Sequence, residues 1–185
     1  MQLTTDNLKL KEKYKEDYLN IVIDLLENTT VQEMKNFRQH YDSTCFEHCL
    51  EVSYWSYIIC KKLGLDYISA ARAGILHDLF LYDWRNSKKN LHLKGFHAFI
   101  HPQIALNNSL KLFELNDKEK DIIIKHMWPV TFFKFPKYAE SYVITLTDKL
   151  SAIKSCLDFY SNILSKKSIY KYAYIFFSFL IFKIG

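Results

Sequence analysis

Residues that interrupt helices are scarce in this chain, whose 185 residues include three prolines and four glycines. Proline removes a backbone hydrogen-bond donor, and glycine costs about 1 kcal/mol relative to alanine inside a helix. Hydrophobic residues make up 49% of the chain, which is enough to form a core. No run of alternating polar and apolar residues favours a β-sheet. The sequence therefore predicts an all-α protein with a single domain over residues 1–185.

Capping signals divide the chain into helices. Thr-x-x-Glu spacing, typical of a capping box, occurs at Thr30 and at Thr44. Proline is favoured at the first position of a helix, which predicts that Pro102 begins one and that His101 lies at its N-terminal edge. The polar stretch 83–96 is expected to be a loop. Helices are expected at about residues 6–27, from Thr30, from Thr44 to Gly64, from Asp66 to about residue 82, from Pro102, from Asn116, and from Pro136 to about residue 164.

The charge of the chain is weakly basic, with 25 lysines and arginines against 20 acidic residues and a net charge of +5. These charges are interspersed, so they predict no specific nucleic-acid binding, although they suit a small anionic substrate. The N-terminus lacks the apolar segment of a secretory signal. A cytoplasmic protein is expected, with its cysteines as reduced core thiols because they form no CxxC pair. The cysteines are Cys45, Cys49, Cys60 and Cys156.

The most apolar stretch lies near the C-terminus, where eleven residues, YAYIFFSFLIF, lie between Lys171 and Lys183. A helix that spans a bilayer needs about 20 such residues. No transmembrane span is therefore expected. The stretch predicts a buried apolar helix at about residues 168–183, and docking to a membrane surface or a partner is the alternative.

Polar residues interrupt the apolar faces of three expected helices. His48 shares a face with Val52, and Asp148 lies four residues from both Ile144 and Ala152. The adjacent His77 and Asp78 follow a run of small residues. Burying an aspartate is costly unless it is paired or binds a metal, so one shared cation is expected. Imidazole and carboxylate ligands together suit manganese, iron, cobalt, nickel or zinc.

The order His48, then His77-Asp78 within GILHDLF, then Asp148 within LTDKLSA resembles the HD-domain superfamily of metal-dependent phosphohydrolases. The resemblance covers a core of about residues 40–155, with N-terminal helices at 6–37 outside it. In that superfamily the matching residues bind metal, and the fold is a bundle of at least five helices. The resemblance thus implies an HD-type helical bundle with His48, His77, Asp78 and Asp148 as ligands.

Two more histidines extend the resemblance, His101 in FHAFIHPQ and His126 in IIIKHMWP. The pattern is similar to the binuclear branch of the superfamily, in which the aspartate of the His-Asp pair bridges two metals. That branch implies that Asp78 bridges and that His101 and His126 hold a second divalent ion. The alternatives are that these two histidines contact phosphate beside one metal, or only cap helix ends.

The resemblance implies hydrolysis of a phosphoester, in a nucleotide or another small phosphate, by a metal-activated hydroxide. Asp78, His101, His126 and Lys149 are the expected catalytic residues. Two other functions share the ligand set: a binuclear iron oxygenase resembling myo-inositol oxygenase, and a catalytically silent signalling or docking module. Weaker candidates for contacts with the substrate are His40, Lys125 and Arg72.

Overall fold

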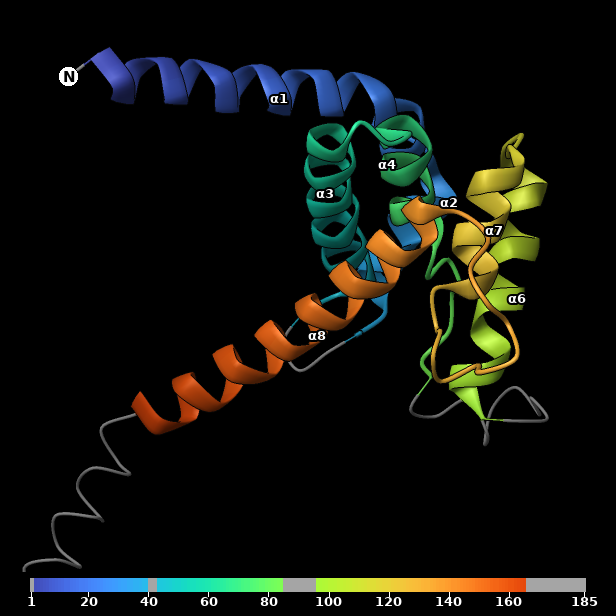
Figure 1. The fold of residues 1–185 in the computed structure, drawn as a ribbon. Helices are drawn as coiled ribbons and strands as arrows, with labels where there is room; N and C mark the ends of the chain where they lie inside the picture. Colours follow the sequence, from blue (N-terminus) through green and yellow to red (C-terminus); the bar gives the residue numbers. More distant parts are fainter. Residues whose placement is uncertain (1, 40–42, 85–95, 166–185) are drawn as a thin grey trace, which may run out of the picture.

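The computed structural model describes residues 2–39, 43–84 and 96–165, and these form helices without any strand (Figure 1). This confirms the all-α prediction. The expected apolar helix at 168–183 lies outside the described residues. The helices are α1 (Gln2–Leu26), α2 (Thr29–Gln32), the 3-10 helix η1 (Glu33–Asn36), α3 (Cys45–Leu63), α4 (Tyr67–Leu76), α6 (His97–Leu112), α7 (Asp117–Lys125) and α8 (Ala139–Ser165).

Side-chain caps set several helix starts. Thr44 before α3 and Asn116 before α7 each form a capping box with the glutamate three residues later. Gly64 ends α3 with φ of 68°, a left-handed conformation that favours glycine. The capping box expected at Thr30 is wrong: Asn28, two residues earlier, caps α2, because its side chain accepts hydrogen bonds from two backbone N–H groups.

Besides the start of α1, which lies at Gln2 rather than near residue 6, three expected boundaries differ from the structure. Helix α4 ends at Leu76, not near residue 82. Leu79 and Phe80 lie beyond the helix but are still buried. Their apolar character therefore did not require helical structure. Helix α6 begins five residues before Pro102, which therefore lies inside it at the cost of one backbone hydrogen bond. Helix α8 begins at Ala139 rather than at Pro136.

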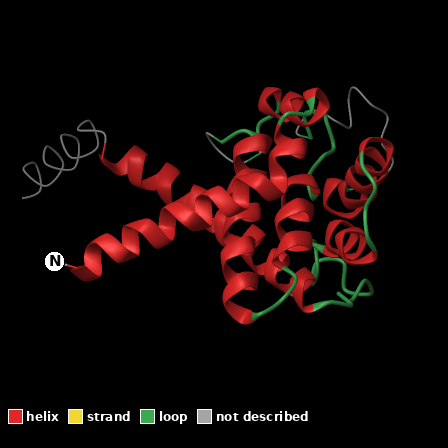
Figure 2. Cartoon of the chain, turned by 90° about the horizontal axis from the view of Figure 1, so that it is seen from above, coloured by secondary structure: helices red, strands yellow, loops and turns green. Residues whose placement is uncertain are grey.

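The core lies where α3 packs against α4, with α1, α7 and α8 around this pair. Figures 1 and 2 show α1 and α8 projecting from the same side of the bundle. Helices α3 and α4 approach closely at Gly74, where an added Cβ would lie 2.6 Å from Ser53 Cα. Among the described residues, no helix is both long and apolar enough to cross a bilayer.

None of the four cysteines forms a disulfide, as the sequence predicts. Cys45, Cys49 and Cys60 are buried, whereas Cys156 on α8 is partly exposed and is not a core residue. The reason is that α8 extends beyond the helices that cover its first half (Figure 1).

The close approach at Gly74 yields a prediction about stability. Gly74→Ala should lower the free energy of unfolding by about 1–3 kcal/mol, because the added methyl group meets the backbone of Ser53 and forces the helices apart. Chemical denaturation measures this change. Gly64→Asn is the control, because nothing lies within 4 Å of its added Cβ and asparagine tolerates a positive φ. Equal losses in the two variants would contradict the prediction.

Candidate metal centre

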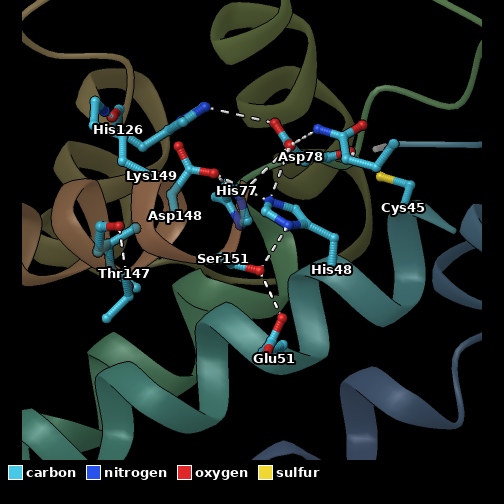
Figure 3. A network of polar contacts seen from close by, with 12 residues as sticks. Cys45, His48, Glu51, His77, Asp78, His126, Thr147, Asp148, Lys149 and Ser151 are labelled. Carbon is cyan, nitrogen blue, oxygen red and sulfur yellow. Dashed lines mark hydrogen bonds and ion pairs between the residues drawn. The ribbon is translucent and has the colours of Figure 1, made fainter. Parts of the chain in front are cut away.

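Six polar residues from five helices converge at one place in the bundle (Figure 3). Figure 3 labels five of them, and His101 joins through His126. Only Asp148 is not fully buried, with 13% of its side chain exposed. The six are His48 in α3, His77 and Asp78 at the end of α4, His101 in α6, His126 at the end of α7 and Asp148 in α8.

Local structure aims these side chains inward. The early end of α4 puts His77 at its C-cap and Asp78 in the following turn, against the helix that carries His48. His126 is likewise the C-cap of α7. His101 lies one turn inside α6, not at its N-terminal edge as the sequence predicted, because α6 begins at His97.

One oxygen of Asp78 faces two imidazole rings. Its Oδ2 atom lies 3.5 Å from His77 Nε2 and 3.9 Å from His48 Nε2. Asp148 closes this group, because its Oδ1 atom lies 3.1 Å from His48 Nε2 and 3.9 Å from His77 Nε2. Two imidazoles and two carboxylates thus surround one point.

The other oxygen of Asp78 faces a second pair of imidazoles. Its Oδ1 atom lies 3.2 Å from His101 Nε2 and 3.5 Å from His126 Nε2. The two Nε2 atoms are 2.8 Å apart. Asp78 therefore belongs to two groups of potential ligands, each with its donor atoms within 4.8 Å of one another. This arrangement is the one that a bridging carboxylate requires.

Backbone hydrogen bonds orient three of the rings. In each, Nδ1 faces a carbonyl oxygen, which only accepts, so Nδ1 carries the hydrogen and the neutral ring presents its Nε2 lone pair to the cluster. Metal-binding histidines are commonly held in this way. The pairs are His77 Nδ1 with Gly74 O, His101 Nδ1 with His97 O, and His126 Nδ1 with Ile123 O, each at 2.8 Å.

Two side chains orient the fourth ring. Ser151 Oγ donates its only hydrogen to Glu51 Oε2 at 2.7 Å. The same oxygen must then accept from His48 Nδ1, 3.3 Å away (Figure 3). His48 Nε2 therefore faces Asp148 with its lone pair unless a proton is added. Ser151 and Glu51 each follow a residue of the cluster by three positions, a spacing that shares a helix face and could have revealed them from the sequence.

The charges of the cluster favour a cation. Burial raises the pKa of Asp78, but His77, His101 and His126 outweigh burial and hold that pKa well below its ordinary value. Burial lowers the pKa of His126 to about 3, although Asp78 opposes this. Burial also lowers the pKa of His48, but the hydrogen bond with Asp148 outweighs it and the pKa is raised. Both carboxylates are thus ionised, and a cation placed among the rings would balance their negative charge.

The residues fit a bound divalent metal. His77 Nε2 is buried and has no hydrogen-bond partner among the described residues, a costly state unless a ligand completes it. The close Nε2 atoms of His101 and His126 repel each other as lone pairs unless a proton or a metal lies beside them. Imidazole with carboxylate is a donor set for manganese, iron, cobalt, nickel or zinc.

Two further residues contact Asp78, and sequence reasoning missed both. The Gln39 amide donates to Asp78 Oδ2. The Cys45 thiol donates to the backbone oxygen of Asp78 at 3.3 Å. Gln39 precedes the helices of the cluster and follows no periodic pattern, so its sequence position carries no signal. Cys45 was expected only as a core thiol.

Lys149, an expected catalytic residue, lies next to the cluster. Its Nζ donates to the backbone oxygens of His126 and Thr145, each at 3.3 Å. Burial lowers the pKa of Lys149, and the neighbouring Asp148 opposes this shift. The ammonium group is therefore held beside His126 and is the next residue in sequence after Asp148.

Two of the three weaker candidates, Lys125 and Arg72, do not join the cluster in the part of the chain that is described. Lys125 forms an ion pair with Asp121 on its own helix. The Arg72 guanidinium binds both carboxylate oxygens of Asp24, at 2.7 and 2.8 Å, and also contacts Glu119. Both side chains thus have acidic partners outside the cluster. His40 lies outside the described residues.

The ligand groups predict which residues retain metal. His77→Ala or Asp78→Ala should remove bound transition metal without unfolding the chain, because both side chains belong to the first ligand group. Metal analysis after purification without chelators measures this, and circular dichroism checks folding. Asp117→Ala is the control, because its side chain is 87% exposed. Full occupancy in the Asp78 variant would refute the assignment.

The contact between Ser151 and His48 predicts a weaker but measurable effect. Ser151→Ala should lower metal affinity about 10- to 100-fold, as the loss of an outer hydrogen bond to a histidine ligand commonly does. Competition with a chromophoric chelator measures the affinity. Ser155→Ala, one turn further along α8, should leave it unchanged. An unchanged affinity in Ser151→Ala would show that the contact does not orient His48.

Comparison with known proteins agrees with this geometry. The chain is 27% identical over 157 residues to Ribonuclease Y of a Nitratiruptor species, an alignment that covers 79% of this chain and 27% of that protein. The chain thus spans only about 27% of the length of that relative. No solved structure matches. The HD domain family matches residues 45–153, which include all six cluster residues. The chain belongs to the HD domain family.

Proposed function

We propose that this protein is a metal-dependent phosphohydrolase that cleaves a phosphoester. The observation that carries the proposal is the position of Asp78, whose two oxygens face two separate groups of imidazole Nε2 atoms. Such a carboxylate suits a pair of divalent ions, with His48, His77 and Asp148 on one side and His101 and His126 on the other.

Divalent metals at such a site act as Lewis acids and lower the pKa of water to about 7 in favourable cases. The chain itself supplies rigidity and exclusion of water. Backbone carbonyls hold three rings, and Ser151 holds the fourth. Burial of five of the six side chains keeps the charges in a medium of low dielectric constant, in which they act strongly on a reacting group.

Positive charge beside the cluster suits an anionic substrate. Lys149 Nζ, held by the His126 carbonyl oxygen, is the chain's candidate for neutralising a phosphoryl oxygen. His101 and His126 complete the site as ligands or as donors to phosphate. We assign catalytic roles to Asp78, His101, His126 and Lys149 on these grounds.

The proposed substrate class is supported by the charge of the chain and by the relative. A small phosphorylated compound such as a nucleotide suits a chain whose net charge of +5 is spread among 20 acidic and 25 basic residues. The name of the relative, a ribonuclease, adds phosphodiesters of RNA to the candidates. Four cysteines without a disulfide fit a reducing compartment such as the cytoplasm.

The hydrolase proposal predicts activity that needs metal but no oxygen. With manganese, cobalt or nickel and under anaerobic conditions, the protein should release product from p-nitrophenyl phosphate, bis-p-nitrophenyl phosphate, nucleotides or a short RNA. Lys149→Ala should lower the rate without loss of metal, and Lys125→Ala should not. Failure on the whole panel, with oxygen consumption by an iron form given a polyol, would establish an oxygenase. Failure of both assays would establish a silent module.

The metal count gives a separate prediction. Replacing His101 or His126 with alanine should reduce the metal content from about two ions per chain to about one, and activity should fall by orders of magnitude as one Lewis acid is lost. Elemental analysis with protein quantification measures the ratio. A ratio of one in the wild type and in both variants would show that these histidines contact phosphate instead.

A further inference from the structure

Exposed aromatic side chains gather where the start of α6 meets the loop between α7 and α8. Phe99 and residues 130–134 line one hollow of about 310 Å³, so the two segments face each other, and Figure 1 shows the loop beside the start of α6. We call the exposed apolar residues here the aromatic patch. They are Phe96 (69% exposed), Phe99 (50%), Val130 (49%), Phe132 (59%), Phe133 (92%) and Phe135 (53%).

The patch is held in place although its side chains are exposed. Asp121 on α7 accepts a hydrogen bond from the backbone of Lys137, which anchors the end of the loop. A turn between Lys134 N and Thr131 O, at 2.9 Å, shapes its middle. The Phe132 ring contacts the rings of Phe133 and Phe135 at centroid distances of 5.7 and 5.6 Å. The loop therefore presents its apolar side chains as a preformed surface.

The charge of this segment has one sign. Residues 127–138 include Lys134 and Lys137 and no acidic residue. Large apolar side chains beside lysines are the composition of surfaces that bind at the interface of an anionic bilayer. The negative surface potential of such a bilayer attracts the lysines, and burial among the acyl chains removes the phenylalanine rings from water.

We propose that the aromatic patch docks the protein on an anionic lipid surface, with Phe132 and Phe133 in the headgroup and acyl boundary and Lys134 and Lys137 at the lipid phosphates. The 92% exposure of Phe133 favours lipid over a protein partner. A protein partner would need a preformed pocket to bury a side chain that is exposed on nearly all sides. Fluid acyl chains can surround such a side chain without one.

Docking at this patch would orient the metal centre. Phe99 lies two residues before His101 on α6, and the loop begins directly after His126. The end of the bundle that carries the second ligand group would then face the bilayer. The docking inference stands on exposure and charge alone, so it holds whether or not the phosphohydrolase proposal does.

Co-sedimentation with vesicles tests the inference. The full chain should bind vesicles of equimolar phosphatidylglycerol and phosphatidylcholine, and bind phosphatidylcholine vesicles at least about tenfold more weakly. The double variant Phe132→Ser/Phe133→Ser should lose at least about tenfold in affinity for the anionic vesicles. Lys134→Gln/Lys137→Gln should also weaken binding and make it less sensitive to salt.

A matched control comes from α8, where Leu150 and Leu157 are 52% and 63% exposed. Leu150→Ser/Leu157→Ser removes as many exposed apolar side chains and should leave vesicle binding unchanged. Unaltered thermal unfolding and metal content would show that each variant is folded. Wild-type binding by the phenylalanine variant, or no preference for anionic vesicles, would overturn the proposal. A change in oligomeric state without vesicle binding would instead make the patch an interface between copies of this chain.

Discussion

The buried carboxylate of Asp78 is the constraint on which the rest of the site depends. An ionised group at 2% exposure is stable only if positive charge and hydrogen-bond donors surround it. The Gln39 amide donates to one of its oxygens, and a cation held by the Nε2 atoms of His77, His101 and His126 would supply the positive charge. These histidines lie in or at the ends of separate helices. The packing of the bundle therefore determines how the charge of Asp78 is balanced.

Close packing makes that arrangement possible. Gly74 lets α3 and α4 approach until the backbone of one meets the other, which brings His48 and the His77-Asp78 pair together. The carbonyl oxygen of the same glycine then orients the His77 ring. Gly74 thus affects both the separation of α3 and α4 and the orientation of the His77 ring.

The sequence predicted much of this in outline. Helical periodicity and capping residues located most helices, because those signals are local and depend on neighbours within one or two turns. They failed at the end of α4 and at the start of α6. Leu79 and Phe80 are buried outside any helix, and Pro102 is accommodated inside one, since tertiary packing outweighs local preference there. Gln39 could not be predicted, because nothing in its neighbourhood marks it.

By itself the sequence determined the helical class, the residue types able to bind a metal, and their order along the chain. Only the tertiary structure decided which of them meet. His48 and Asp148 are 100 positions apart, yet their nitrogen and oxygen lie 3.1 Å from each other. It also decided that the oxygens of Asp78 divide between two groups of imidazoles, and that Arg72 and Lys125 bind other carboxylates. Periodicity shows which face of a helix is inward, but the rotation and separation of helices arise from side-chain packing across the whole chain.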